Sequence, residues 1–365
     1  MKILCERDAL KESLAAVIGR TKHGKSVPIL AHILLNAEGQ KLRLTGNDLQ
    51  ACSIVEMPCE VSEPGAFTIP GDRLNKLVSG LPTGGQIKIE ADDKSAKVRA
   101  GRSIYTFAGL PAADFPPAFE LRDAQEITLT GKQLQRLLKI PAPAISQEQS
   151  RPHICGLFLH HEKGRILACA TDGHTLIRTS VEVDIPRFDG IIIPDEACSE
   201  IVRLAGDGDV TLRVSSTLIE AESGKRRFVS KIVDATFPDY LPVIPQSAPV
   251  PFTVEVSDID EAITRLAAAG EAERAATIRI SWERDSDRIL ISRRTEFGEG
   301  NEEIACDCTG RDAGEIAFQS GYVRRLIEAS GGKIARLHFD GPGDPARITS
   351  PDDADFVSVI MPCRA

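Results

Sequence analysis

Several features are scarce or missing in this chain of 365 residues, and each absence narrows the kind of protein it can be. Aromatic residues make up only 5% of the sequence, with a single tryptophan, so we expect cores of aliphatic side chains. No stretch approaches the roughly 18 uncharged apolar residues that a membrane-spanning helix needs. The chain reaches Glu6, Arg7 and Asp8 almost at once, where a signal peptide would have an apolar core. We therefore expect a cytoplasmic protein.

Metal-ligand spacings and an excess of positive charge are also missing. The nine cysteines include one close pair, Cys306 and Cys308, whose single-residue spacer fits neither a zinc site nor a redox motif, so buried thiols are expected. The seven histidines form no HExxH or paired Cys/His pattern, so we expect no metal and no cofactor. The net charge of −9 argues against a basic protein that coats nucleic acid, and any DNA contact must be local.

What the chain does contain is an internal repeat. Three segments open with a short strand and an amphipathic helix: MKILCERDALKESLAAVI from residue 1, EITLTGKQLQRLLKI from 126 and FTVEVSDIDEAITRLAAA from 252. Apolar residues recur in each helix at steps of three and four, which indicates one buried face. A second strand and helix follow in each segment: FTIPGDRLNKLVSGL from 67, IIIPDEACSEIVRLA from 191 and IAFQSGYVRRLIEAS from 316.

The spacing of the repeat predicts the architecture. Ile-Pro steps at 69–70 and 193–194 lie 124 residues apart, and Phe-Pro steps at 115–116 and 237–238 lie 122 apart. A strand-rich protein could yield such patterns by chance, but here order and spacing are both preserved. We predict an α+β fold of three tandem, β-rich, two-helix modules at 1–124, 125–248 and 249–365. The expected helices are 7–18, 72–79, 131–139, 195–204, 258–268 and 321–329.

Two short motifs suggest chemistry that their context does not favour. Residues 19–26, GRTKHGKS, match the phosphate-loop pattern, which works only between a strand and a helix. Here a helix precedes the motif, and Pro28 and a strand-like stretch follow it, so a basic loop is the better interpretation. The TDGH sequence at 171–174 could pair a histidine base with an aspartate. A turn in which Asp172 bonds its own backbone is simpler, and a binding pocket at this turn is the favoured reading. We expect no catalytic residues.

Six stretches in a fixed order resemble the bacterial β sliding clamp, the processivity subunit of the replicative DNA polymerase III. They are VPILAHILL at 27–35, LTGNDLQ at 44–50, LPAADFP at 110–116, ATDGHTL at 170–176, FPDYLPVIP at 237–245 and VIMPCR at 359–364. The resemblance covers the whole chain. It implies a homodimer joined head to tail into a ring, with helices lining the hole and sheets outside.

The resemblance also implies partners and site residues. Double-stranded DNA would be bound without sequence preference, and the polymerase, the clamp loader and repair proteins would dock through short linear peptides. The implied peptide site comprises Ile154, Thr171, Gly173, His174, Thr175, Leu176, Pro242, Val243, Tyr322, Val359, Ile360, Met361 and Pro362. The implied DNA contacts are Arg20, Lys22, Lys25, Arg73, Lys132, Arg136 and Arg151. The implied dimer interface contains Tyr105, Phe107, Leu266 and Ala269.

Some positions depart from the family pattern. Thr175 and Pro242 stand where arginine is frequent, so the peptide site has less positive charge. The expected helix 258–268, which carries Leu266 of the implied dimer interface, ends in alanines at 267–269, where bulkier aliphatic side chains are usual. An accessory clamp with altered partners therefore stays an alternative to the replicative clamp. A nucleotide-binding enzyme that uses the GRTKHGKS loop is a further alternative from a different class.

Overall fold

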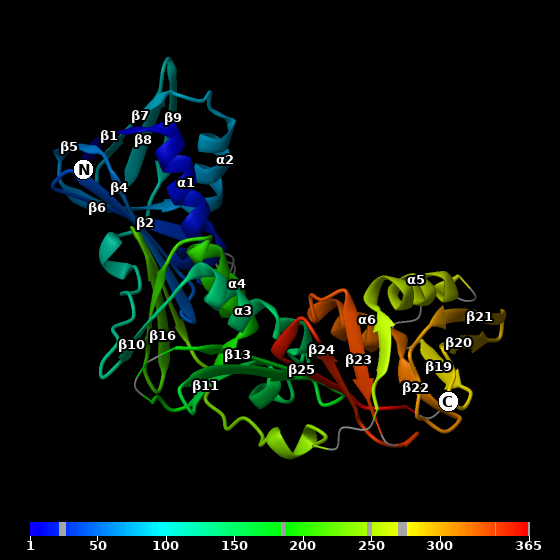
Figure 1. Cartoon of the computed structure of the whole chain (residues 1–365). Helices are drawn as coiled ribbons and strands as arrows, with labels where there is room; N and C mark the ends of the chain where they lie inside the picture. Colours follow the sequence, from blue (N-terminus) through cyan, green and yellow to red (C-terminus); the bar gives the residue numbers. More distant parts are fainter. Residues whose placement is uncertain are drawn as a thin grey trace. The chain divides into compact units, whose positions relative to one another are not determined.

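The computed structural model describes residues 1–21, 27–183, 185, 187–246, 250–268, 276–339 and 341–363. Six α-helices lie within these residues (Figure 1). They are α1 (Arg7–Val17), α2 (Gly71–Gly80), α3 (Gly131–Lys139), α4 (Asp195–Ala205), α5 (Val256–Ala267) and α6 (Ser320–Ala329). Each lies within two residues of its predicted bounds, so the apolar periodicity located all six. None of these helices is long and apolar enough to cross a membrane.

The strands among the described residues form four sheets with antiparallel pairing throughout. A five-stranded sheet has the order β5 (Glu60–Glu63), β1 (Lys2–Glu6), β7 (Gln86–Ala91), β8 (Ser95–Ala100) and β9 (Ser103–Ala108). A four-stranded sheet has the order β21 (Gly298–Ala305), β20 (Arg288–Thr295), β19 (Thr277–Trp282) and β22 (Gly314–Gln319).

The two remaining sheets have eight strands each. The first has the order β10 (Gln125–Leu129), β15 (Val210–Val214), β16 (Leu218–Ser223), β17 (Arg226–Lys231), β4 (Ala51–Pro58), β3 (Lys41–Asn47), β2 (His32–Glu38) and β6 (Gly65–Pro70). The second has the order β14 (Ile191–Pro194), β11 (Gly156–Glu162), β12 (Arg165–Thr171), β13 (Thr175–Glu182), β25 (Asp353–Ile360), β24 (Ala346–Ser350), β23 (Ile334–His338) and β18 (Phe252–Glu255). Each of these two eight-stranded sheets takes strands from two of the predicted modules.

The chain divides into two compact units, and the eight-stranded sheets explain why the number is not three. One unit comprises Met1–Leu134 and Ser199–Ile232, and the other comprises Gln135–Cys198 and Val233–Ala365. The middle third of the sequence gives β15, β16 and β17 to the first unit and β11, β12 and β13 to the second. Long-range strand pairing thus groups residues differently from the sequence repeat, whose module boundaries stay a prediction.

The strand pairing of the first eight-stranded sheet recurs in the second with the same spacing as the sequence repeat. In the first eight-stranded sheet Leu34 pairs with Thr45 and Ser53 pairs with Phe228. In the second, Phe158 pairs with Cys169, so both members of the first pair recur 124 residues later. Because a slip of one residue would turn every side chain to the other face, equal registers mean that equivalent positions face the same side.

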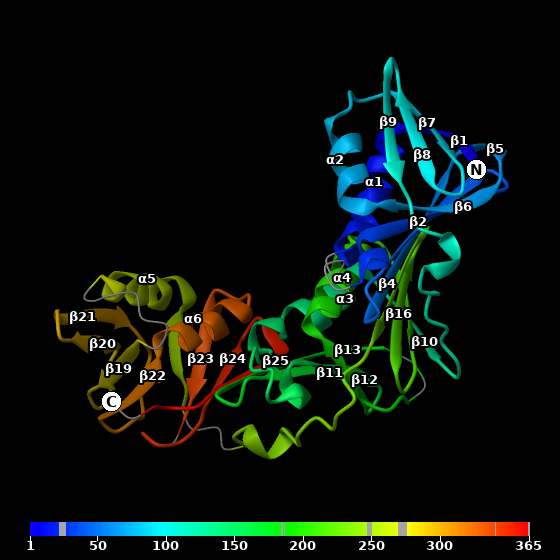
Figure 2. The same ribbon diagram turned by 180° about the vertical axis from the view of Figure 1, so that it is seen from behind.

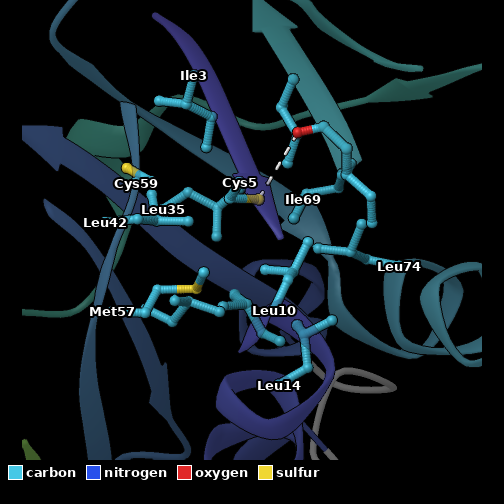
Figure 3. Close-up of a cluster of buried hydrophobic side chains, with 14 of the residues drawn as sticks. Ile3, Cys5, Leu10, Leu14, Leu35, Leu42, Met57, Cys59, Ile69 and Leu74 are labelled. Atoms are coloured by element: carbon cyan, nitrogen blue, oxygen red, sulfur yellow. Dashed lines mark hydrogen bonds between the residues drawn. The ribbon is translucent and has the colours of Figure 1, made fainter. Parts of the chain in front are cut away.

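The core of the first unit follows from two simple periodicities (Figure 3). Alternate residues of β1, Ile3 and Cys5, point inward. Leu10 and Leu14, four residues apart on α1, lie on one face of that helix and are fully buried. Helices α1 and α2 lie side by side over this core, as both views show (Figures 1 and 2). Aliphatic side chains dominate the cluster, as the low aromatic content predicted.

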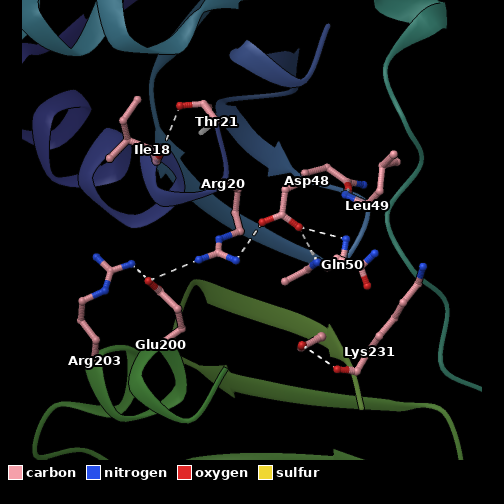
Figure 4. Close-up of polar contacts among 12 residues, drawn as sticks. Ile18, Arg20, Thr21, Asp48, Leu49, Gln50, Glu200, Arg203 and Lys231 are labelled. Carbon is pink, nitrogen blue, oxygen red and sulfur yellow. Dashed lines mark hydrogen bonds and ion pairs between the residues drawn. The ribbon is translucent and has the colours of Figure 1, made fainter. Parts of the chain in front are cut away.

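A buried ion pair holds the end of α1 against the first eight-stranded sheet (Figure 4). Arg20, in the 3-10 turn Ile18–Thr21, is 2% exposed, and its Nη1 lies 2.9 Å from Asp48 Oδ2. The second nitrogen of the guanidinium lies 3.7 Å from Glu200 on α4. Asp48 also accepts hydrogen bonds from the backbone nitrogens of Gln50 and Ala51, so one carboxylate shapes the turn between β3 and β4 and fixes the arginine.

We predict that Arg20→Met destabilises the first unit by about 3 kcal/mol, because it leaves the buried Asp48 carboxylate without its cation. Hydrogen exchange of the β4 amides, with urea unfolding of the whole chain, measures the loss. The exposed Arg73 on α2 provides the matched control, and Arg73→Met should change stability by about 0.5 kcal/mol or less. Adding Asp48→Asn to Arg20→Met should recover part of the loss. Equal stability of the Arg20→Met and Arg73→Met variants would contradict a stabilising role for the Arg20–Asp48 ion pair.

Candidate functional site

The TDGH sequence forms the turn between β12 and β13. The Oδ1 atom of Asp172 accepts hydrogen bonds from the backbone nitrogens of His174, at 3.0 Å, and Thr175, at 2.7 Å. Gly173 has φ +89°, a conformation that residues with a Cβ rarely adopt. The predicted turn is therefore confirmed. Asp172 is engaged by its own backbone and by an arginine, so it is not placed to orient His174 as a base.

Arg325, on α6, completes this turn, and sequence reasoning missed it. Its Nη2 donates to Asp172 Oδ2 at 2.7 Å and to Thr175 Oγ1 at 2.6 Å, and its guanidinium lies 4.8 Å from the centre of the Tyr322 ring. Burial raises the pKa of Asp172, but the hydrogen bonds from Arg325, Thr175 and His174 outweigh it and leave the pKa below its usual value. The partner is 153 residues away, and no local pattern could have identified it.

The C-terminal segment lies beside the turn because β13 and β25 are neighbours. Leu176 pairs with Val359 and Thr175 with Ile360. The pairing continues past β25, where the backbone nitrogen of Met361 donates to the His174 carbonyl oxygen at 2.9 Å. The rings of His174 and Tyr322 lie 6.0 Å apart and nearly parallel. The structure therefore brings together residues that the sequence placed in three separate segments.

The predicted peptide-site residues divide into a buried and an accessible group. Ile154, Leu176 and Val359 belong to one buried cluster, which also contains Tyr240 and Ile244 from the FPDYLPVIP segment. Thr175 and Ile360 are buried as well, and Thr171 is partly exposed with its hydroxyl bonded to the Thr175 carbonyl. The remaining residues are wholly or partly accessible: Gly173, His174, Pro242, Val243, Tyr322, Met361 and Pro362.

We call His174, Pro242, Val243, Tyr322, Met361 and Pro362 the tail surface. Its exposed apolar side chains include Val243, at 45%, and Met361, at 40%. Tyr240 and Ile244 bracket the 3-10 turn Leu241–Val243 and anchor it to the same buried cluster that supports Met361's strand. An accessible apolar surface on a rigid support can bind the apolar side chains of a peptide.

The predicted DNA contacts have different fates. Arg73 and Lys132 are exposed and Arg151 is partly exposed, so these three can reach a phosphate. Arg20 is a correction, because the structure buries it in the ion pair with Asp48. Arg136 donates through Nη1 and Nη2 to the two carboxylate oxygens of Asp353, at 2.7 and 2.6 Å, and through Nε to the Ser180 carbonyl oxygen. Its guanidinium is therefore occupied within the chain. Lys22 and Lys25 lie outside the described residues.

The predicted interface residues are also divided. Tyr105 is 41% exposed on β9, an edge strand, and Phe107 is partly buried against its own core. Leu266 is a correction: it is 3% exposed and packs inside its own chain, so it offers no surface to a partner. Its position on the buried face of α5 explains this, because it continues the apolar stripe of Ile259 and Ile263. Ala269 lies outside the described residues.

The remaining motifs have structural explanations. In the GRTKHGKS stretch, a 3-10 turn ends at Thr21, residues 22–26 lie outside the described part, and a 3-10 turn Pro28–Ala31 leads into β2. No α-helix begins in the described residues after this motif and before α2. Seven of the nine cysteines are buried and two are partly exposed, all as free thiols. The described residues contain no group of three or more His, Cys, Asp or Glu side chains that could hold a metal.

Family models account for nearly the whole chain. Residues 1–120 match the N-terminal domain of the DNA polymerase III beta subunit, residues 128–239 its central domain and residues 242–364 its C-terminal domain. The beta sliding clamps of Caulobacter vibrioides and Pseudomonas aeruginosa are 32% and 30% identical, with complete coverage of both chains.

Solved structures agree with these sequence matches. The DNA polymerase III subunit beta from Pseudomonas aeruginosa has a TM-score of 0.94 at 30% identity, with complete coverage of both chains. The beta sliding clamp from C. crescentus, solved with PEG bound to its "putative beta-motif tethering region", has a TM-score of 0.94 at 31% identity, and covers 100% and 99% of the two chains.

Three β-rich, two-helix domains in tandem define the class: clamp-fold proteins, which are processivity factors and not enzymes. The chain belongs to the DNA polymerase III beta subunit family, the bacterial β sliding clamps. The predicted family, its role in DNA replication, the α+β class and the three-domain organisation are thereby confirmed.

We predict that Asp172→Asn loosens the TDGH turn and lowers the affinity of the tail surface for its ligands. Because the folded pKa of Asp172 is lowered, its ionised form stabilises the turn at every pH above the unfolded value of about 3.9. That contribution is lost as the pH falls through the lower folded pKa. Exchange protection of the Thr175 amide should therefore be constant from about pH 5 to 8 and decrease below about pH 4. The asparagine variant should lack this acid step, and a wild-type step near neutral pH would contradict the assignment.

Proposed function

We propose that two copies of this chain join head to tail into a ring around duplex DNA, and that the tail surface tethers the replicative polymerase to that ring through short peptides. The observation that carries the proposal is that Leu176, Val359 and the residues flanking the Pro242-Val243 turn share one buried cluster. Val243 and Met361, next to this cluster in the chain, are exposed. Module boundaries at 1–124, 125–248 and 249–365 are part of this proposal, and the bounds of the three family matches support them. Because it would act on replicating DNA, we place the protein in the cytoplasm.

Unpaired sheet edges support the ring. The edge strand β9 exposes Ile104, at 56%, and Tyr105. The edge strand β21 of the four-stranded sheet follows a turn with the exposed Phe297. Exposed edges with apolar side chains are ready to pair with another chain. Pairing β9 of one chain with β21 of its partner makes two identical joints by two-fold symmetry and closes the ring.

Charge supports sequence-independent contact with DNA. Arg73 on α2 and Lys132 on α3 lie on helices that the ring arrangement turns toward the hole, and Arg151 precedes the 3-10 turn Pro152–Ile154. Because Arg20 is buried and Arg136 is paired to Asp353, three of the predicted contacts within the described residues are available to DNA: Arg73, Lys132 and Arg151. Few phosphate contacts mean weak, salt-sensitive binding, which suits a protein that must slide.

The alternatives differ in how much supports them. A replicative clamp and an accessory clamp share the fold and the family, and the second is favoured only by Thr175 and Pro242, which remove two cations from the peptide site. Thr175 is buried here and bonded to Arg325, so a guanidinium still lies beside the turn. The nucleotide-binding enzyme has no support from the described residues that flank residues 22–26, since they form 3-10 turns and a strand.

For the ring, we predict that the protein has twice the mass of the 39.5 kDa chain in light scattering at about tens of micromolar. The double variant Ile104→Asp, Tyr105→Asp should be a folded monomer, because charges on an edge strand oppose pairing. Leu49→Asp, at a site 43% exposed in the turn between β3 and β4, is the matched control and should stay dimeric. A monomeric wild type would contradict the ring.

For the tail surface, we predict micromolar binding of a peptide of about five or six residues that carries leucine or phenylalanine near its end. Each buried anchor contributes roughly 1.5 to 3 kcal/mol, offset by ordering of the peptide. Met361→Asp should weaken binding about tenfold or more and abolish stimulation of the polymerase, because it puts a charge against the anchor. Leu49→Asp is again the control, and both variants should remain dimers. Leu176→Asp is unsuitable, since that residue is buried and the change would unfold the site. Unchanged binding to the Met361 variant would sink the assignment.

A further inference from the structure

One face of the first eight-stranded sheet has a hollow of about 590 Å³, distant in sequence from the tail surface. Strands β2, β3, β4 and the start of β17 form its floor, and residues 115–118 form one wall. Apolar atoms come from Leu34, Ile54 and Phe115, with Pro116 and Ala118 at the wall. The volume falls in the range of sites that bind small molecules or side chains.

The second eight-stranded sheet has an equivalent position, and there the position is occupied by side chains of the chain itself. Its strand β11 has the register of β2, so Phe158 and His160 hold the positions that Leu34 and Asn36 hold in the first sheet. The same offset relates Ile54 to Arg178 on the following strands. The two surfaces are therefore equivalent in backbone and different in side chains.

The chain segments that cover the two sheets are equivalent as well. Phe115-Pro116 and Phe237-Pro238 are the matching steps of the sequence repeat, and both phenylalanines are buried. Counting from these steps, Ala118 takes the place of Tyr240.

In the second sheet the position is filled by aromatic side chains. Phe158 stacks on Phe237 with ring centres 4.8 Å apart and planes within 4°. The Tyr240 hydroxyl lies 2.9 Å from His160 Nε2, and Tyr240 is almost fully buried. The second sheet thus provides its own tyrosine as a plug, and the hydroxyl has a hydrogen-bond partner.

The first sheet lacks this plug. Alanine replaces the tyrosine at 118, leucine replaces phenylalanine at 34, and asparagine replaces histidine at 36. All three residues line the hollow, so the space is where the missing aromatic side chains would lie. Asn36 keeps a polar group where His160 bonds the tyrosine hydroxyl.

The rim of the hollow is basic in a chain of net charge −9. Five basic residues line it, Lys41, Arg43, Lys225, Arg226 and Arg227, against two acidic residues, Glu56 and Glu222. Lys41 and Arg43 share the single carboxylate of Glu56, whose pKa the hydrogen bonds from Arg43 and Lys41 lower, so that it is ionised at neutral pH.

The other cations differ in how far they are already neutralised. Arg226 and Arg227 pair with Glu12 and with the buried Glu220. Lys225 forms no ion pair with any described residue. Uncompensated positive charge therefore remains at Lys225 and at the pair that shares Glu56.

We propose that this hollow binds an extended acidic peptide of a partner protein, with one tyrosine inserted where the second sheet places its own. The tyrosine ring packs on Leu34, Ile54 and Phe115, its hydroxyl bonds Asn36, and flanking carboxylates meet Lys225 and the shared pair. This site is independent of the tail surface and would add a second docking point to each copy of the chain.

The test measures anisotropy of a fluorescein-labelled pentapeptide, DEYED, with the full-length protein. We expect saturable binding that weakens about tenfold or more for DEAED, since loss of a buried aromatic anchor has that effect. KKYKK should not bind. Ala118→Tyr rebuilds the plug of the second sheet and should abolish DEYED binding, whereas Ala113→Tyr, at an exposed alanine five residues earlier, should leave it unchanged.

A second variant and a second peptide keep the outcomes distinct. Lys225→Glu, at an exposed residue whose change should not disturb folding, should weaken DEYED binding and reduce its salt dependence. The leucine- or phenylalanine-bearing peptide of the tail surface should bind Ala118→Tyr as it binds the wild type, which separates this site from the proposed function. Absence of DEYED binding up to about 1 mM, equal binding of DEAED, or DEYED binding that survives both variants would overturn the proposal.

Discussion

Antiparallel pairing between strands of successive repeats is the constraint on which the rest of this structure depends. In each eight-stranded sheet, one such pair joins four strands of one repeat to four strands of the next: β4–β17 in the first sheet and β13–β25 in the second. Backbone hydrogen bonds fix the register, and the register fixes which side chains face outward. Leu176 lies opposite Val359 for this reason, and the chain beyond β25 emerges beside the TDGH turn. Strand pairing therefore places Met361 beside His174. The Pro242-Val243 turn is held instead through Tyr240 and Ile244 in the buried cluster, and Tyr322 lies beside the His174 ring.

The turn at Asp48 and the TDGH turn at Asp172 are equivalent positions of the repeat, 124 residues apart, and their carboxylates pair with different arginines. Asp48 and Asp172 each accept hydrogen bonds from two backbone nitrogens of their own turn, and each pairs with an arginine. For Asp172 the arginine is Arg325 of α6, whereas for Asp48 it is Arg20, which also faces Glu200 of α4. The carboxylate is the shared element. A carboxylate that accepts backbone hydrogen bonds within its turn and also binds a guanidinium holds that turn in one conformation.

A protein of this family has no reaction to catalyse, so its chemistry resides in surfaces. The proposed ring uses the exposed edge strands β9 and β21, and the proposed tethering uses the tail surface. The proposed DNA contact uses accessible cations such as Arg73 and Lys132. The hollow on the first eight-stranded sheet differs from the tail surface, because it has a basic rim around an apolar floor. The side chains of Leu34, Asn36 and Ala118 have no ring, whereas in the second eight-stranded sheet the rings of Phe158, His160 and Tyr240 close the equivalent space.

The sequence by itself determined the helices, the order of the repeat, the TDGH turn and the family, because these depend on local periodicity and on motifs read in order. Tertiary structure alone decided which charges are available. Arg20 and Arg73 look alike in sequence, yet one is enclosed with Asp48 and the other is exposed. It also decided that Leu266 faces its own core and that Arg325 reaches Asp172 across 153 residues. The hollow is likewise invisible in the sequence of one repeat. The hollow exists because the side chains around it leave space unfilled. Those side chains come from strands that only long-range pairing brings together.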